Sequence, residues 1–390
     1  MARVRSIDTA CVHAGREDFG DLGIHALPID LSTTYPMHQL AEGTADYDAL
    51  AAGAAAPMRT GVYQRLHNPT VARFERAVAA LEGAEAAVAF STGMAAVTAL
   101  LMAAAMRGRH VVAVRPIYGG TDHLLQSGML ALDVTWAAPH EVGDALRPDT
   151  ALVLIETPGN PTCTLVDIAD VVRQAGTVPV AVDSTFATPV LQRPLALGAA
   201  VSLHSATKFI GGHGDAMGGV IATSEAMAHP MRQVRILTGA LLHPMGAYLL
   251  HRGLATLALR VEGAQQRAVA LAGRLAAHPA VSAVHFPGLP GEDPTGLVGR
   301  QMTGPGSMLS FELAGGHDAA AAVMGRVRLI TPAVSLGGTD SLIQHPAGLT
   351  HRLLDPRDRA AAGIGDGLLR FSVGLEGVDD LWADLSQAMA

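Results

Sequence analysis

The chain has 390 residues, of which 49% are hydrophobic and 16% are charged, and its formal net charge is −8 at pH 7. This length is enough for a large buried core in one or more domains. The negative balance, without any run of basic residues, argues against nucleic acids and anionic membranes as partners.

The basic residues are almost all arginine. Of the 27 Lys and Arg residues, 26 are Arg by count, which leaves Lys208 as the single lysine. An amine can lose its proton and act as a nucleophile or base, whereas a guanidinium in practice cannot. Thr207 precedes Lys208 where a phosphate-binding P-loop requires Gly, so that class of nucleotide site is excluded. Lys208 is therefore the first candidate for a chemical role.

The predicted elements follow one another as in an α/β protein. Residues 1–60 have little hydrophobic periodicity and predict an extended arm, whereas 69–82 carry one apolar face and predict a helix. Short apolar runs then alternate with helical stretches, which predicts a mostly parallel sheet buried on both faces. Residues 244–274 predict one or two long helices, and the mixed pattern after 279 predicts a smaller α+β domain. The predicted strands are 86–90, 111–114, 151–155, 178–182, 201–203 and 219–222.

An acid and the lysine follow two of these strands. Asp183 ends the run at 178–182, and Lys208 lies 25 residues later in the segment Ser205-Ala-Thr207-Lys208. This pair fits pyridoxal phosphate (PLP), whose aldehyde forms a Schiff base with a lysine amine. A carboxylate opposite the pyridine nitrogen keeps the ring an electron sink. Asp183 alone is equally well explained as a helix cap after a strand.

Candidate phosphate ligands lie in three segments. Gly93 and Met94 open an Ala-rich helix after the strand at 86–90, and helix N-termini bind anions, although an ordinary helix start explains them as well. Hydroxyls flank the lysine at Ser205 and Thr207. The phenol of Tyr63 and the guanidinium of Arg65 suit either a phosphate clamp or a surface turn. The candidate phosphate ligands are therefore Tyr63, Arg65, Gly93, Met94, Ser205 and Thr207.

Three further side chains follow predicted strands or lie in one. Tyr118 is suited to stacking on a cofactor ring or to the core, and Asn160 to bonding a ring hydroxyl or to making a turn. Arg370 lies in an otherwise apolar strand and needs a carboxylate partner. That partner is either a substrate α-carboxylate or an internal acid.

From Tyr63 to the C-terminus, these motifs together resemble the Cys/Met-metabolism family of PLP-dependent enzymes, which includes methionine γ-lyase, cystathionine γ-lyase, cystathionine γ-synthase and O-acylhomoserine sulfhydrylase. The resemblance implies a type I aminotransferase-like fold. It also implies a PLP-binding domain at 61–250, a C-terminal domain at 251–390, and an arm at 1–60 that contacts a neighbouring subunit.

The resemblance further implies the roles of single residues. Lys208 is the Schiff-base lysine and proton carrier, and Asp183 is the partner of the pyridine nitrogen. Tyr118 is the stacking ring and the candidate acid for the leaving group. The phosphate contacts are Gly93, Met94, Ser205 and Thr207, joined by Tyr63 and Arg65 of a neighbouring subunit, and the substrate-carboxylate contacts are Ser335 and Arg370.

Residues contributed across an interface imply at least a dimer, and a homotetramer is expected. The only two cysteines, Cys11 and Cys163, suit a reducing compartment, and Cys163 is expected to be an ordinary thiol. The N-terminal residues lack the apolar stretch of a signal peptide. We therefore expect a cytoplasmic protein that acts on a small amino acid, with no membrane partner and no metal site among its scattered histidines.

The expected reaction is γ-elimination on a sulfur amino acid such as methionine, which gives a thiol, 2-oxobutanoate and ammonia. His123 stands where cystathionine enzymes usually carry an Arg, and Gly120 where methionine γ-lyases carry a Cys. Asp340 stands where cystathionine γ-lyases carry a Glu. The alternatives are therefore a cystathionine γ-lyase or γ-synthase, an O-acylhomoserine γ-replacement enzyme and, in another class, a non-catalytic PLP binder.

Overall fold

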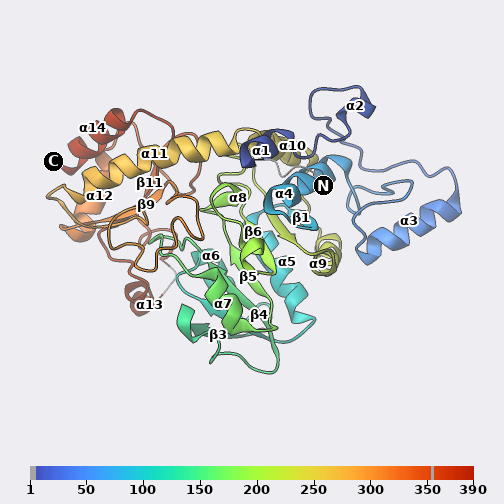
Figure 1. Ribbon diagram of the computed structural model, residues 1–390, viewed down its shortest axis with the longest axis horizontal. Coiled ribbons are helices and arrows are strands. Elements are labelled where there is room, and N and C mark those ends of the chain that lie inside the picture. The colour runs from blue at the N-terminus through green and yellow to red at the C-terminus, as the bar shows by residue number, and fades with distance from the viewer. Residues whose placement is uncertain (1–5, 353–354) are drawn as a thin grey trace.

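The computed structural model describes residues 6–352 and 355–390, so the first five residues of the predicted arm lie outside the described part. A large central sheet with helices on both faces occupies the middle of the molecule, and a smaller sheet lies at the end that carries the C-terminus (Figure 1).

The central sheet has seven strands in the order β1-β7-β6-β5-β4-β2-β3. β7 pairs antiparallel with both of its neighbours, and the other pairs are parallel, which confirms the predicted mostly parallel sheet. All six predicted strands form, whereas the edge strand β3 was missed. The strands are β1 (Ala86–Phe90), β2 (His110–Val114), β3 (Asp133–Ala137), β4 (Thr150–Glu156), β5 (Val180–Asp183), β6 (Val201–His204) and β7 (Gly219–Thr223).

Helices cover both faces of this sheet. On one face, α5 (Gly93–Ala105) and α9 (Glu225–Thr238) pack against alternate strand residues such as Val88 and Ile221. The opposite face packs against α4 (Pro69–Glu82) at one end and α7 (Ile168–Ala175) at the other. The remaining helices of this part are α6 (Gly119–Gln126), α8 (Thr188–Leu191) and two short 3-10 helices, Pro139–Glu141 and Pro194–Leu197.

The helix α4 shows how local sequence sets these boundaries. Asn68 Oδ1 accepts hydrogen bonds from the amides of Thr70 and Val71, and Pro69 occupies the first turn, where no amide is needed. Gly83 ends the helix in the left-handed conformation at φ +69°. The predicted helix at 69–82 is therefore confirmed to the residue.

The C-terminal part has a five-stranded sheet in the order β10-β11-β12-β9-β8 with helices packed on it. The one or two long helices predicted at 244–274 are two, and the longer, α11, packs on the central part and on the C-terminal sheet (Figure 1). The elements are α10 (Pro244–Leu254), α11 (Leu257–Ala276), β8 (Val281–His285), β9 (Met308–Leu313), α12 (Gly316–Arg326), β10 (Thr331–Pro332), β11 (Leu342–Gln344), α13 (Pro356–Ala361), β12 (Leu368–Ser372) and α14 (Val378–Met389). The proposed division into domains remains a prediction.

The N-terminal segment is more ordered than its sequence pattern suggested. It contains α1 (Ile7–His13), α2 (Phe19–Leu22) and α3 (Leu40–Ala52), where only an extended arm was expected. Cys11 of α1 is buried in the main core against α4 and α11. The helix α3 projects from one end of the molecule (Figure 1). Within the described residues, no helix is both long and apolar enough to cross a bilayer.

Candidate active site

A cavity of about 430 Å³ lies beyond the carboxyl ends of the parallel strands, where α/β sheets bind their ligands. All but two of the predicted site residues line it, although they come from positions 93 to 370 of the chain. They are Gly93, Met94, Tyr118, Asn160, Asp183, Ser205, Thr207, Lys208, Ser335 and Arg370.

Lys208 follows β6 and points into the cavity. Its Nζ donates a hydrogen bond of 2.7 Å to Ser335 Oγ. Burial, assisted by the positive charge of Arg370, lowers the pKa of Lys208 to about 8. An ammonium in this position loses its proton more readily than an ordinary lysine, and the neutral amine is the form that attacks an aldehyde.

Asp183 ends β5, and the hydrogen bonds that its carboxylate makes with other described residues all fall on one oxygen. Its Oδ1 accepts from the Thr185 amide at 3.0 Å and from Thr185 Oγ1 at 2.5 Å. Burial raises the pKa of Asp183, so a charged carboxylate here needs a donor at Oδ2. A protonated pyridine nitrogen is such a donor, and the geometry fits the predicted role.

The start of α5 forms a cradle suited to a phosphate. Thr92 Oγ1 accepts a hydrogen bond from the Ala95 amide. The amides of Gly93 and Met94 are the first two of the helix, and they have no acceptor within it. A Cβ on Gly93 would lie 2.9 Å from both Cβ and Oγ of Ser205, so only glycine permits this approach. The donor set and the space both fit an anion at a helix N-terminus. The hydroxyl of Thr207 is held by Gly218, from whose amide it accepts a bond of 3.0 Å.

Arg370 is buried in β12, and its hydrogen-bond partners are neutral. Its Nη1 donates to Asn160 Oδ1 at 3.0 Å and its Nη2 to the Ser335 carbonyl at 2.7 Å. Burial lowers its pKa to about 10. Arg370 takes part in no ion pair with a described residue, so the internal acid considered from the sequence is not found there. A guanidinium without a counter-ion on a cavity wall is suited to a substrate carboxylate.

Tyr118 precedes α6, is 39% exposed and lines the cavity. A Cβ on Gly120 would lie 2.6 Å from Tyr118 Cε1, so the glycine at this position allows the ring to take its observed orientation. The backbone amide of Tyr118 donates a bond of 2.6 Å to Glu156 Oε2. Glu156 was not singled out from the sequence, although it ends β4 just as Asp183 ends the adjacent strand β5.

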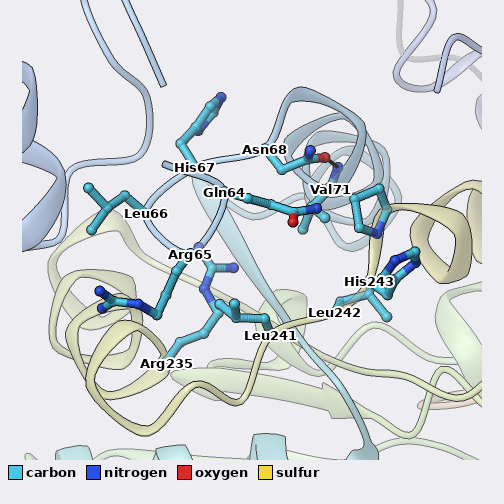
Figure 2. Close-up of a pocket in the computed structure, with 11 residues that line it drawn as sticks. Gln64, Arg65, Leu66, His67, Asn68, Val71, Arg235, Leu241, Leu242 and His243 are labelled. Atoms are coloured by element: carbon cyan, nitrogen blue, oxygen red, sulfur yellow. Dashed lines mark hydrogen bonds between the residues drawn. The ribbon is translucent and has the colours of Figure 1, made fainter. Parts of the chain in front are cut away.

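The two remaining predicted residues, Tyr63 and Arg65, lie outside this cavity. Tyr63 is 45% exposed, and the Arg65 guanidinium lies 5.7 Å from the centre of its ring. Figure 2 shows Arg65 in a second, smaller pocket beside Arg235 and Leu241. Within a single chain the two residues therefore do not reach the main cavity, and a contribution to a neighbouring subunit remains a prediction.

Residues considered for specificity are placed as follows. His123 is exposed beside an adjoining cavity of about 180 Å³ and does not line the main one, and Asp340 is also exposed away from it.

Burial raises the pKa of Cys163 to about 12, which makes the thiol unreactive near neutral pH. Among the residues that the structure describes, there is no group of three or more His, Cys, Asp or Glu side chains that could hold a metal.

Comparison with known proteins agrees with this geometry. Residues 8–390 match the family model described as "Cys/Met metabolism PLP-dependent enzyme". Proteins named L-methionine gamma-lyase are 58% identical in Brevibacterium sandarakinum (98% of this chain, 97% of the relative) and 54% identical in Streptomyces avermitilis (99% and 89%). The crystal structure of a cystathionine gamma synthase from Xanthomonas oryzae pv. oryzae superposes with a TM-score of 0.90 at 36% identity, covering 99% of this chain and 98% of the other.

These matches extend over nearly the whole chain, and they confirm the predicted fold class and the use of PLP. They also show that the molecule is an enzyme of sulfur amino acid metabolism with a small-molecule substrate. The chain belongs to the Cys/Met-metabolism family of PLP-dependent enzymes.

Proposed function

We propose that the protein is a carbon–sulfur lyase that carries out γ-elimination on methionine or a related S-alkyl amino acid, with release of a thiol, 2-oxobutanoate and ammonia. Relatives that are 58% and 54% identical are named L-methionine gamma-lyase, and this supports the proposal. The alternative is γ-replacement on an O-acylhomoserine or a reaction of cystathionine.

The distribution of charge in the cavity carries the proposal. The charged side chains that line it are Glu156, Asp183, Lys208 and Arg370, with Arg370 as the one guanidinium among the described lining residues. One guanidinium suits one carboxylate. The rest of the wall is largely apolar and suits an uncharged S-alkyl tail; it includes Met94, Val97, Phe186, Met217, Val334, Leu336 and Leu349.

Arg370 and Ser335 would bind the substrate α-carboxylate. The carbonyl of Ser335 already accepts a bond from Arg370 Nη2, so the two residues hold one another in place. Lys208 Nζ lies beside Ser335 Oγ, close to where the α-carbon of a substrate so bound would lie. With its pKa at about 8, this amine is suited to take a proton from Cα and then one from Cβ.

The cofactor, when bound, supplies an electron sink for negative charge that develops at the substrate carbons. Asp183 Oδ2 would hold its ring nitrogen, and the amides of Gly93 and Met94 with the Ser205 hydroxyl would hold its phosphate. The phenol of Tyr118 reaches the cavity and is the candidate that donates a proton to the leaving sulfur.

We also propose that the active form is a homotetramer of two dimers, in which Tyr63 and Arg65 complete the phosphate site of a neighbouring subunit. The exposure of Tyr63 and its distance from its own cavity support this arrangement. The two cysteines, Cys11 and Cys163, are free and buried, which is compatible with the predicted reducing, cytoplasmic setting.

Product analysis with and without a thiol tests the reaction type. The purified holoenzyme is incubated separately with methionine, cystathionine, homocysteine and O-acetylhomoserine, each with and without added thiol. A lyase releases 2-oxobutanoate from methionine without added thiol. Formation of a thioether from O-acetylhomoserine only when thiol is present, with no keto acid from methionine, would show a replacement enzyme instead.

A further inference from the structure

Glu156 is the acidic residue on the cavity wall to which the sequence assigned no role. It ends β4 in register with Asp183 of the parallel strand β5, so that the two acidic residues lie side by side at the carboxyl ends of these strands. Glu156 is only 5% exposed. Burial and the neighbouring Asp183 raise its pKa well above the ordinary value. Burial of a carboxylate costs free energy unless hydrogen bonds compensate for the lost water.

Each oxygen of Glu156 has one backbone donor. Oε2 accepts from the Tyr118 amide at 2.6 Å, and Oε1 accepts from the Asn160 amide at 3.1 Å. These donors belong to loops that follow the adjacent strands β2 and β4. The Glu156 side chain therefore holds the backbone of Tyr118 and the backbone of Asn160, whose side-chain oxygen accepts a bond from Arg370.

The hydrogen bonds continue from Asn160 to the lysine. Asn160 Oδ1 accepts from Arg370 Nη1 at 3.0 Å, Arg370 Nη2 donates to the Ser335 carbonyl at 2.7 Å, and Ser335 Oγ accepts from Lys208 Nζ at 2.7 Å. All of these residues line the same cavity. A continuous series of hydrogen bonds thus joins Tyr118 to Lys208. Glu156 links Tyr118 to Asn160, where the rest of the series begins.

We propose that Glu156 is a positioning residue that holds Tyr118 and Asn160, and through Asn160 holds Arg370, in the one arrangement that accepts an amino-acid substrate. This inference rests on the proposed function of the cavity and assigns to it a residue that acts through Tyr118 and Asn160. A carboxylate suits the position because it offers an acceptor to each amide, whereas glutamine has only one acceptor oxygen.

Glu156→Gln tests the proposal, with Asp384→Asn as a matched control. Asp384 is also a buried carboxylate that accepts backbone amides, those of Arg328, Leu329 and Ile330, and it lies in α14 away from the cavity. If Glu156→Gln does not fold, Glu156→Asp keeps the charge but shortens the reach, and it should give a smaller effect in the same direction.

Two measurements on the holoenzymes separate positioning from stability. The first is the dissociation constant of norleucine, which has the shape of methionine but no leaving group, read from the visible absorption of the cofactor. The second is kcat/KM for methionine, and the melting temperature of every variant is recorded beside them. Because misplacement of reacting groups by about 1 Å costs on the order of 100-fold in rate, we expect that loss in Glu156→Gln, together with weaker norleucine binding.

The control should change only the melting temperature. The proposal is overturned if Glu156→Gln binds norleucine and converts methionine within about twofold of the wild type, or if Asp384→Asn loses both to the same extent. Norleucine binding does not depend on elimination, so a wild-type enzyme that binds norleucine but leaves methionine intact would count against the proposed reaction and not against the role of Glu156.

Discussion

Lys208 Nζ and Ser335 Oγ are 2.7 Å apart, although 127 positions separate the two residues in the chain. Ser335 has a φ of +86°, in the left-handed region that non-glycine residues rarely adopt. Such backbone strain is typical of functional sites. The contact places the reactive amine beside the residue whose carbonyl accepts a bond from Arg370, and it joins the loop after β6 of the central sheet to the C-terminal part at the cavity.

Replacement of Lys208 should abolish catalysis. Lys208→Arg keeps a positive charge but removes a titratable amine, and we expect a loss in kcat of at least about 100-fold, the lower range for a general base. Turnover of methionine is the measurement. Because Lys208 is the single lysine, reduction of the wild-type holoenzyme with borohydride should add the cofactor mass to the peptide that contains Lys208. Labelling of any other internal peptide would contradict the assignment.

The lowered pKa of Lys208 can be measured directly in cofactor-free protein. Its pKa of about 8, compared with 10.5 for an ordinary lysine, means that the amine is mostly neutral above pH 8 and mostly charged below it. The rate of acylation of Lys208 should therefore rise with pH to a plateau, with a midpoint near 8. Mass spectrometry of the Lys208 peptide over pH 6 to 11 gives this midpoint, and a value close to 10.5 would show that burial does not perturb the amine.

Arg370→Lys should weaken substrate binding. Lysine keeps the charge but cannot form the paired contacts of a guanidinium with a carboxylate. Loss of a hydrogen bond to a charged group costs about 1.5–3 kcal/mol, so KM for methionine should rise by about 10- to 100-fold. Arg232→Lys is the control, because Arg232 is also buried but pairs with Glu225 at 2.5 Å in α9, away from the cavity. Equal KM values for the two variants would refute the role of Arg370.

Gly93→Ala should weaken cofactor binding. The new Cβ would lie 2.9 Å from the side chain of Ser205 and would force the start of α5 away from it. Gly273→Ala in α11 is the control, since a Cβ there would meet no atom within 4 Å, and alanine favours a helix. The dissociation constant of PLP is obtained by titrating protein from which the cofactor has been removed. It should rise at least about tenfold for Gly93→Ala alone, which corresponds to a loss of roughly 1.4 kcal/mol in binding free energy. An unchanged affinity for PLP would show that the start of α5 does not bind the cofactor phosphate.

Acid should destabilise the protein through His251. This side chain is buried, its Nε2 lies 2.9 Å from the Ala14 carbonyl, and burial lowers its pKa from 6.5 to about 4. The unfolded chain therefore binds a proton that the folded chain refuses, so that stability present above pH 6.5 is lost as the pH falls toward 4. The loss is at most about 3 kcal/mol. In urea unfolding, His251→Gln should show a shallower fall over this range, and an unchanged slope would contradict the prediction.

The sequence predicted the central sheet because its strands are continuous apolar runs buried on both faces. The edge strand β3 was missed because Asp133 and Thr135 interrupt its apolar pattern and its residues are only partly buried. The helices α1 and α3 also gave no periodic signal. α1 is instead stabilised by the Ser6 cap and by packing on α4 and α11, which are distant in sequence.

Lys208 and Arg370 could be singled out from the sequence because their residue type restricts the chemistry, and both line the cavity. Glu156 was not singled out from the sequence, because an acid at a strand end can also be a helix cap or part of a turn. Its two partners, the backbone amides of Tyr118 and Asn160, are brought to it only by the fold. The rule that singled out Asp183 would also have found it, since both residues end adjacent parallel strands. His123 and Asp340, which were considered for substrate specificity, do not line the cavity, and sequence spacing does not reveal this.

The most direct test of the account compares kcat/KM for methionine and for cystathionine with the same preparation of holoenzyme. Cystathionine carries a second carboxylate and a second amine, whereas the described cavity wall has Arg370 as its one guanidinium. An unpaired charge against an apolar wall is costly, so methionine should be preferred by at least about tenfold, or roughly 1.4 kcal/mol. Equal values, or a preference for cystathionine, would contradict the proposed substrate class.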